Sequence, residues 1–344
     1  MQTTNMVNVL IPSYNHEDFI NQCLNSALKQ TNQDFEISII DDFSSDNTFE
    51  QLLQFQDQER VNIFKNPINM GANYSVNRMI QSSRHEYIAL LNSDDEWMPD
   101  KLEKQVRFLD ENPNYAAVFS HAITIDENGK HIKHPFEKVF SQPNRTSQEW
   151  LRYFFTEYNC LCHPSILIKR SVYEDVGLYN PLMAALPDFE MWVRICSKYE
   201  IHILQEPLVK FRVLNQERNA SSLNPRNLRA FSYEIKKIFD LYLLLSLKQL
   251  NKIFNANYTT IEEAHFNLAT IAVNNPKKCK SQIEWGLDVL YNLMSQGKVL
   301  NLISHVEFNN LVKCRDIYAF IERDSRFYKI YNLINRFKKN FIEH

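Results

Sequence analysis

The sequence is poor in glycine, with only five glycines among its 344 residues. No two of them lie close enough along the chain to form the glycine-rich loop that wraps a phosphate group. This scarcity excludes both the GxGxxG dinucleotide-binding pattern and the Walker-type nucleotide loop. A protein with this composition that binds a nucleotide must hold the diphosphate with a cation or with basic side chains.

The chain also lacks long apolar runs and paired cysteines. Its most lipid-like stretch, LYLLLSL at 241–247, is far shorter than the roughly 20 residues that a membrane-spanning helix needs. The six cysteines show no CxxC spacing, and the N-terminal MQTTNMVNVL contains no charged segment that leads into an apolar run. We therefore expect a reduced, cytoplasmic protein that does not cross a bilayer.

Neither sign of charge dominates the sequence. The 38 lysines and arginines nearly balance the 41 aspartates and glutamates, which gives a formal net charge of -3. This balance provides no global positive field, so we expect no nucleic-acid partner. Hydrophobic residues make up 44% of the chain and charged residues 23%, which is typical of a folded globular protein.

Segments of strand and helix character alternate through the first hundred residues. Short apolar runs typical of buried strands lie at 7–11, 35–40, 61–64 and 87–91. Helical patterns follow at 17–29, 47–55, 74–81 and 100–109. This alternation predicts right-handed crossovers and a mainly parallel central sheet, whose ligands bind beyond the carboxyl ends of the strands.

The pattern changes along the rest of the chain. Strand character continues in four further segments, at 116–125, 162–168, 201–204 and 208–213. A helix is expected at 188–199, with Trp192 facing the core. Later stretches are rich in leucine, isoleucine and lysine and carry no comparable strand signal. We therefore predict an α/β domain at 1–225 and an all-helical region at 226–344.

Polar segments directly follow three of the predicted strands: Pro12-Ser13-Tyr14-Asn15, Asp41-Asp42 and Asn92-Ser93-Asp94-Asp95. Because the carboxyl ends of parallel strands meet at one edge of a sheet, we expect these segments to converge. Tyr14 offers a ring face and a hydroxyl to a nucleobase, and Asp41 is an acceptor suited to the imide N–H of uracil. Each also has a structural interpretation, local packing for Tyr14 and a turn or helix cap for Asp41.

Four segments, in this order and spacing, resemble family 2 glycosyltransferases of the GT-A fold: VLIPSYN, IIDDFSSDNT, LLNSDDEWMPDKLEKQ and PDFEMWVRI. The resemblance covers about residues 7–222, and four motifs in order are far more specific than any one of them. It implies an inverting transferase that uses a nucleotide-diphosphate sugar and a divalent metal, Mn or Mg. It further implies a donor site that includes Pro12, Tyr14, Asn15, Asp41 and Asn77.

Asn92-Ser93-Asp94 occupies the place of the family's DxD motif. The resemblance implies that Asp94 binds the metal and that Asn92 and Ser93 bind the donor. The amide of Asn92 removes a negative charge and should weaken metal binding without nucleotide, although Mg and Mn often use only one or two protein carboxylates. Asp95 is a second acid that can compensate. The structural alternative is a solvated acidic loop that caps the helix beginning near Asp100.

Two later motifs carry further roles. Asp188, in Pro187-Asp188-Phe189-Glu190, matches the family segment whose aspartate is the general base at a helix start, and its structural alternative is a simple helix cap. Arg212 matches the end of the family's catalytic domain, which implies a contact with the diphosphate. Relatives often carry a histidine where this chain has Leu214.

The resemblance implies transfer of a sugar from a nucleotide-sugar donor to a hydroxyl of a glycan or lipid-linked acceptor in bacterial surface polysaccharide synthesis. UDP is the nucleotide that the family favours. Two alternatives stay open. Asn92 and Leu214 favour a non-catalytic module that binds a nucleotide or glycan, and a nucleotidyltransferase would normally need the glycine-rich loop that is missing here.

The C-terminal stretch 327–341 mixes basic and aromatic residues. This composition suits a membrane surface and would place the protein peripherally at the inner membrane face. A terminal helix packed on the rest of the helical region is an equally good interpretation.

Overall fold

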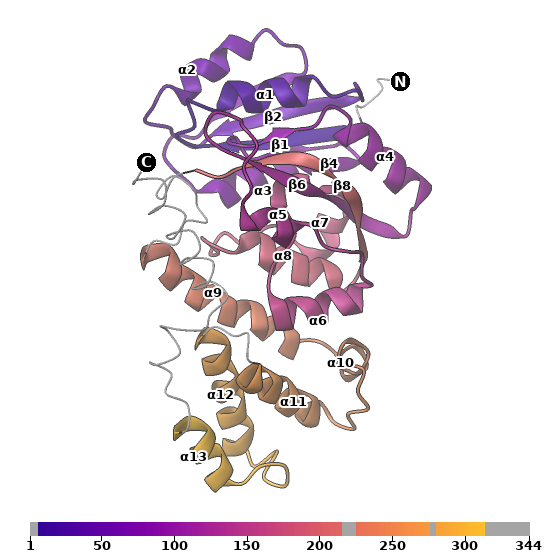
Figure 1. Cartoon of the computed structure of the whole chain (residues 1–344), viewed down its shortest axis with the longest axis vertical. Helices are drawn as coiled ribbons and strands as arrows, with labels where there is room; N and C mark the ends of the chain where they lie inside the picture. Colours follow the sequence, from indigo (N-terminus) through magenta and orange to yellow (C-terminus); the bar gives the residue numbers. More distant parts are fainter. Residues whose placement is uncertain (1–5, 215–224, 276–279, 314–344) are drawn as a thin grey trace. The chain divides into compact units, whose positions relative to one another are not determined.

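The computed structural model describes residues 6–214, 225–275 and 280–313. The described residues of 1–147 and 159–219 form one compact unit, and those of 148–158 and 220–344 form a second. The first unit contains the sheet, and the second is built of helices (Figure 1). The segment 148–158 belongs to the helical unit although both of its neighbours in the chain belong to the first.

The first four strands form in the order that the sequence predicts. Their elements are β1 (Val7–Ser13), α1 (Ile20–Leu28), β2 (Phe35–Asp41), α2 (Thr48–Leu52), η1 (Leu53–Phe55), β3 (Val61–Lys65), α3 (Ala72–Ser82) and β4 (Tyr87–Leu90). α1 forms because Ile20, Cys23, Leu24 and Ala27 recur at helical spacing and are all buried on one side. The apolar runs and helical periods thus give the expected alternation.

The remaining elements of the first unit are shorter and more varied. They are β5 (Glu96–Trp97), α4 (Lys101–Glu111), β6 (Tyr115–Ile125), α5 (Pro135–Phe140), η2 (His163–Ser165), β7 (Leu167–Lys169), α7 (Arg170–Val176), α8 (Pro187–Cys196) and β8 (Glu200–Arg212). α8 confirms the helix predicted from 188 onward, and its Trp192 is buried as expected.

The eight strands form one mixed sheet in the order β3-β2-β1-β4-β7-β6-β8-β5. β1 pairs in parallel with β2 and β4, and β2 pairs in parallel with β3. β7 is antiparallel to β4 and β6, β5 is antiparallel to β8, and β6 and β8 are parallel. The carboxyl ends of β1, β2 and β4 therefore lie at one edge, which confirms the predicted parallel arrangement of the polar strand ends.

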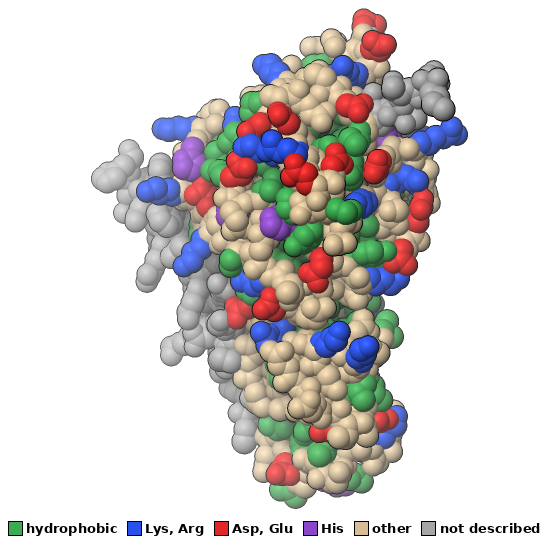
Figure 2. Space-filling model, turned by 90° about the vertical axis from the view of Figure 1, so that its right-hand side faces the viewer, with side chains coloured by type: hydrophobic (Ala, Val, Ile, Leu, Met, Phe, Trp, Pro, Cys, Tyr) green, Lys and Arg blue, Asp and Glu red, His purple; other side chains and the backbone are tan. Residues whose placement is uncertain are grey.

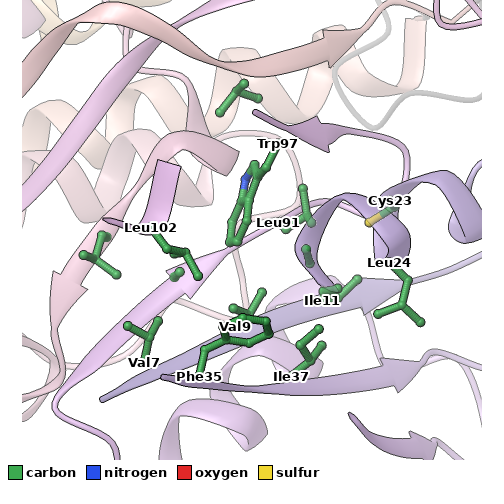
Figure 3. Close-up of a cluster of buried hydrophobic side chains, with 14 of the residues drawn as sticks. Val7, Val9, Ile11, Cys23, Leu24, Phe35, Ile37, Leu91, Trp97 and Leu102 are labelled. Atoms are coloured by element: carbon green, nitrogen blue, oxygen red, sulfur yellow. The ribbon is translucent and has the colours of Figure 1, made fainter. Parts of the chain in front are cut away.

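A cluster of buried apolar side chains anchors these strands. Val7, Val9 and Ile11 alternate along β1 and so point to one face of the sheet, where Leu24 of α1 and Leu102 of α4 pack (Figure 3). Fully burying one such side chain stabilises a fold by about 1.5–3 kcal/mol. The strand ends are thus held in place by the core and do not depend on a ligand.

Two predictions for the second half of this unit were wrong. The strand expected at 162–168 is interrupted by η2, because Pro164 has no backbone N–H to donate and the Ser165 hydroxyl donates to the Cys162 carbonyl at 2.7 Å. The strands expected at 201–204 and 208–213 form the single strand β8, whose register against β6 shifts at Leu204 and Pro207. The helices α5 and α7 were not predicted.

The second unit consists of α6 (Ser147–Glu157, from Gln148 onward), α9 (Pro225–Leu243), α10 (Leu247–Phe254), α11 (Ile261–Asn274), α12 (Lys280–Ser295) and α13 (His305–Lys313). Phe155 lies at its centre, with its ring centroid 5.0, 4.9 and 5.8 Å from those of Phe239, Tyr242 and Trp285. Buried Gln282 donates to the Phe155 carbonyl at 2.7 Å. The helices α9 to α13 confirm the predicted helical C-terminal region as far as it is described. α6 falls inside the predicted domain 1–225 and was not predicted as a helix. The stretch 327–341 lies outside the described residues.

Two surface properties bear on the sequence predictions. In the described part of the chain, no helix has both the length and the apolar character to span a membrane. Figure 2 shows acidic and basic side chains interspersed on the visible face, as the balanced charge of the sequence leads one to expect.

Candidate active site

The segments that follow β1 and β2 are tied together by Asn15. Its backbone has a left-handed φ of 52°, its N–H donates to the Ser44 hydroxyl at 3.0 Å, and its Oδ1 accepts the Ser45 N–H at 2.8 Å. Tyr14 beside it is 45% exposed, so its ring is accessible for stacking. Pro12 lies within β1, in register with Ile40. Asn15 thus holds Tyr14 at the open edge of the sheet.

The two acids that end β2 have different partners. Asp41 is fully buried, and its oxygens accept the N–H and the hydroxyl of Ser44 at 3.0 and 2.5 Å. Asp42 accepts the N–H groups of Met70 and Gly71 at 2.8 and 2.7 Å. Gly71 has a φ of 88°, which favours glycine, so Asp42 fixes a tight turn into α3. The Asp41 carboxylate still has lone pairs for a further N–H donor.

The loop after β4 contacts the segment after β1. The His16 Nδ1 atom lies 2.7 Å from the hydroxyl of Ser93, which is buried. The side-chain amide of Asn92 donates to Asp95 Oδ2 at 3.1 Å, and the Asn92 carbonyl accepts from the Cys23 thiol at 3.3 Å. The structure therefore brings the three predicted polar segments together through hydrogen bonds.

Arg212 holds this loop from the opposite side. Its side chain is completely buried, and all five of its N–H groups have protein acceptors at 2.7 to 3.2 Å. The acceptors are the carbonyl oxygens of Asp94, Asp126 and Glu127 and the side-chain oxygens of Gln22 and Glu96. The guanidinium carbon also lies 4.9 Å from the centre of the Phe19 ring. In this arrangement Arg212 binds the loop itself, and its contact with a diphosphate stays a prediction.

The three acidic side chains of the loop differ in how many hydrogen bonds and ion pairs they make. Asp95 is buried and accepts the Arg212 backbone N–H at 2.7 Å as well as the Asn92 amide. Burial raises the pKa of Asp95 well above its usual range, and Asp94 raises it further, while the two hydrogen bonds oppose the shift. Glu96 pairs with Arg212 and Lys210 at 2.7 and 3.0 Å. No described residue donates a hydrogen bond to the Asp94 carboxylate.

The carboxylates of this loop can bind a divalent cation only together with other ligands. Among the described residues, no group of three or more His, Cys, Asp or Glu side chains is arranged to hold a metal ion. Asp94 supplies one available carboxylate, which suits Mg or Mn when a substrate diphosphate and water complete the coordination. The residues present do not suit a cation that the protein binds by itself.

Asp188 is the second residue of α8, and its carboxylate is half-buried. Asp188 Oδ2 accepts the side-chain amide of Asn159 at 2.8 Å, and Oδ1 accepts the Phe189 N–H at 2.8 Å. His163 lies nearby, with its Nε2 3.1 Å from the Tyr179 hydroxyl. Burial lowers the pKa of His163, while the negative charge of Asp188 opposes that shift. A carboxylate with one donor on each oxygen keeps lone pairs that can accept a proton.

Asn77, predicted to bind the donor, instead joins α3 to the segment before α8. Its side chain donates to the Tyr179 carbonyl at 2.7 Å and accepts the Tyr179 N–H at 3.0 Å. Asn73, one turn earlier, donates to the Met183 carbonyl at 2.6 Å. Both asparagines therefore position the chain that leads to Asp188, and a donor contact of Asn77 stays a prediction.

Several of these residues were missed by sequence reasoning. Asp42 follows the predicted Asp41 directly in the chain. It differs from Asp41 in that its carboxylate accepts hydrogen bonds from the N–H groups of Met70 and Gly71. His16 directly follows the first motif, which was a usable signal. Asn73 and Asn159 are isolated asparagines, and nothing in their local sequence indicates a partner.

Residues 8–177 match the model of the Glycosyl transferase family 2. This part of the chain belongs to glycosyltransferase family 2. Its mixed sheet is the GT-A-like fold that the resemblance predicted, with a helical C-terminal region after it. Family membership supports transferase activity.

Similar proteins come from several organisms. An uncharacterized glycosyltransferase of Methanocaldococcus jannaschii is 29% identical over 235 residues, which are 67% of this chain and 78% of that protein. TuaG of Bacillus subtilis, whose name assigns it to teichuronic acid biosynthesis, is 29% identical over 238 residues, 68% of this chain and 89% of TuaG.

Among solved structures, residues 1–349 of Staphylococcus aureus TarS in complex with UDP match this chain with a TM-score of 0.56 and 16% identity, covering 90% of this chain and 88% of that one. The same TarS fragment has been solved with UDP-GlcNAc, with a TM-score of 0.51. At this identity the likeness shows the fold alone.

Proposed function

We propose that the protein is an inverting glycosyltransferase that moves a sugar from a UDP-sugar to a hydroxyl of a glycan or lipid-linked acceptor in bacterial surface polysaccharide synthesis. Family membership supports the reaction class, and the name of TuaG and the UDP and UDP-GlcNAc complexes of TarS support the setting and the donor. The observation that carries the proposal is the Asp188 carboxylate, held half-buried by one donor on each oxygen at the start of α8.

The donor binds at the edge formed by the ends of β1, β2 and β4. In this proposal the exposed ring of Tyr14 stacks on the base. Asp41 is fully buried beneath Ser44, so it accepts the imide N–H of uracil only after the Ser44 segment moves aside. The segments that carry Asn15, Asn92 and Ser93 are already joined by hydrogen bonds. Apart from the movement of the Ser44 segment, binding therefore requires little ordering of the protein, which favours affinity.

Asp94 would hold a divalent cation together with the diphosphate. Such a cation, when bound, supplies Lewis-acid stabilisation of the charge on the departing diphosphate. Asp94 suits this role because its carboxylate is the one in the loop with no described donor, whereas Asp95 and Glu96 are already paired.

In the chemical step Asp188 accepts the proton of the acceptor hydroxyl. As that proton leaves, the hydroxyl oxygen attacks the anomeric carbon from the face opposite the diphosphate. The bond from the anomeric carbon to the diphosphate oxygen breaks, and the nucleoside diphosphate departs with its electron pair. One displacement inverts the anomeric centre, and general-base assistance of this kind contributes about 100- to 10,000-fold in rate.

A panel of nucleotide sugars that includes UDP-GlcNAc tests this function, with free nucleoside diphosphate measured with and without Mn. We expect Asp188→Asn to keep donor affinity and to lose about 100- to 10,000-fold in rate. We also expect a loss of stability of about 1–2 kcal/mol, because its single side-chain oxygen cannot accept both the Phe189 N–H and the Asn159 amide. An amide accepts the Phe189 N–H as well as a carboxylate does, so the helix start is preserved. A rate within a few-fold of wild type would remove Asp188 from the role of base.

The second candidate function is a non-catalytic nucleotide- or glycan-binding module. It is favoured by Leu214, which is apolar and 7% exposed at the place where relatives often carry a histidine, and by Asn92, whose amide is engaged with Asp95. Nucleotide binding without release of nucleoside diphosphate, for every sugar of the panel, would support this module. Release of pyrophosphate would point to a nucleotidyltransferase.

We propose a cytoplasmic location, with peripheral contact at the inner membrane face through 327–341. The basic and aromatic composition of that stretch supports the proposal. Co-sedimentation with vesicles of anionic and neutral lipid tests it, with a chain truncated before residue 327 as the control. Equal sedimentation of the full and truncated chains would contradict it.

A further inference from the structure

We infer that Asn159 is a positioning residue for Asp188, fixing the orientation of its carboxylate. The inference rests on the proposed function for the role of Asp188, and its own basis is the pair of hydrogen bonds that Asn159 makes.

The amide of Asn159 can adopt only one orientation. Its Oδ1 accepts the Leu161 N–H at 3.1 Å, and its Nδ2 donates to Asp188 Oδ2 at 2.8 Å. A flipped amide would put its NH2 group against the Leu161 N–H and its oxygen against the carboxylate, so both contacts would become repulsive. The backbone of Leu161 thus aims the donor of Asn159 at Asp188.

The Asp188 carboxylate is in turn fixed by donors from two separate segments. Asn159 holds Oδ2 from the chain before η2, and the Phe189 N–H holds Oδ1 from the first turn of α8. This arrangement sets the rotation of the carboxylate plane and so the direction of the remaining lone pairs. Orienting a base in this way is what a positioned proton acceptor needs.

Other titratable groups also face Asp188. His163, Tyr179 and Cys162 lie close enough to interact with its charge. On α8 itself, Glu190 is paired with Arg194 at 2.7 Å. None of these groups donates a described hydrogen bond to the Asp188 carboxylate, so Asn159 is the side chain among the described residues that does so.

The test compares Asn159→Ala with a matched control, Asn144→Ala. Asn144 also bridges two segments of the first unit through both ends of its amide, donating to the Ile203 carbonyl at 3.0 Å and accepting the Ile203 N–H at 2.7 Å. Asn144→Ala removes these two hydrogen bonds and a longer contact from Nδ2 to His202 Nε2 at 3.4 Å, so its loss of stability should be of similar size to that of Asn159→Ala. Only Asn159→Ala removes a donor from Asp188.

Two readouts separate positioning from structure. The first is the titration of the Asp188 carboxyl carbon, followed by NMR in protein with 13C-labelled aspartate, which requires no substrate. We expect its midpoint to rise by roughly one pH unit in Asn159→Ala, because a lost donor disfavours the charged carboxylate. The second is the pH dependence of UDP release from UDP-GlcNAc. The acidic limb of this profile should move to higher pH in Asn159→Ala. We also expect kcat to fall about tenfold and the KM for the donor to stay unchanged.

A second variant keeps the inference testable if Asn159→Ala does not fold. Asn159→Asp retains an acceptor for the Leu161 N–H but places a second carboxylate against Asp188, so the midpoint should rise further than in Asn159→Ala. A midpoint that is the same in wild type and both foldable variants, or that moves equally in Asn144→Ala, would overturn the inference. Full activity of Asp188→Asn would instead overturn the proposed function, and the NMR titration would still report whether Asn159 acts on Asp188.

Discussion

The loop after β4 and the start of α8 differ in how deeply they bury their charged groups. In the loop, Arg212 directs all five N–H groups to protein acceptors, and each oxygen of Asp95 accepts a hydrogen bond in a buried setting. At α8, each oxygen of Asp188 has one partner and the carboxylate stays half-buried. Asp95 and Asp188 each have one donor on each oxygen, so burial is what separates them: the buried carboxylate of Asp95 is closed to a ligand, and the half-buried carboxylate of Asp188 keeps an accessible side.

Asp94 and Asp95 repeat this contrast between adjacent residues. The backbone carbonyl of Asp94 accepts the Arg212 Nε–H at 2.7 Å, which leaves its side chain outside the buried network. Asp95 turns its side chain into that network. Asp94 and Asp95 are neighbours in the chain. A difference in stability between an Asp94 variant and an Asp95 variant therefore reflects the contacts of each side chain and not its location in the fold.

Replacing the centre of the network should have the largest effect on stability. We expect Arg212→Leu to lower the free energy of unfolding of the first unit by about 3–5 kcal/mol, since it leaves Glu96 and three carbonyl oxygens without their donor. Hydrogen exchange of β1 and β4 peptides at increasing urea measures this change separately from the helical unit.

Lys210→Met is the control for that substitution. Lys210 also pairs with Glu96, but its side chain is 33% exposed, so its loss should change stability by less than about 1 kcal/mol. If both variants changed the free energy of unfolding equally, Arg212 would contribute no more than a surface charge does. The buried hydrogen bonds of Arg212 would then not be what stabilises the loop.

Asp95→Asn should have an intermediate effect that depends on pH. The amide can still accept the Arg212 N–H, and Asn92 can turn its own amide to match, so we expect a change of about 1–2 kcal/mol. Burial raises the pKa of Asp95 in the folded protein. Its favourable contribution is therefore fully present below the ordinary aspartate range and is lost as the pH rises through the raised folded value.

The variant should accordingly gain stability relative to wild type as the pH is raised from 4.5 to 8. Urea-dependent hydrogen exchange at several pH values within that interval measures the difference. A difference that is constant over the whole interval would mean that Asp95 is ionised to the same extent in the folded and unfolded chain.

The sequence carried the framework of this molecule but few of its side-chain partners. Apolar runs and helical spacing located β1, β2, β4 and α8, because burial on a sheet or helix face leaves a local pattern. The interruption at Pro164 and the joining of two segments into β8 depend on hydrogen bonds between distant parts of the chain. Local periodicity does not contain that information.

For the candidate site, too, the sequence indicated where residues lie but not which partners they bind. Motif order placed the three polar strand ends, which the structure joins by hydrogen bonds, and it placed Asp188 at the start of a helix, where the structure has it. Arg212 resembled a ligand-binding residue, yet its acceptor Gln22 lies 190 residues away in the chain. The partners of Asp42 and Asn159 likewise come from other segments. A residue type at a motif position indicates which chemistry is available there, and only its three-dimensional neighbours show whether that chemistry is already used.

Asp94→Ala should have the smallest effect on stability and a clear effect on ligand binding. Because no described residue donates to its carboxylate, we expect the free energy of unfolding to change by no more than about 0.5 kcal/mol. The backbone carbonyl that accepts the Arg212 Nε–H is kept by the alanine. Titration calorimetry of UDP with and without MnCl2 measures the other half of the prediction: wild type should bind UDP more tightly with Mn, and the variant should bind it equally in both conditions. If Mn still strengthens UDP binding to the variant as much as to wild type, the cation is held elsewhere, and the contrast between the filled network and the open carboxylate does not extend to metal binding.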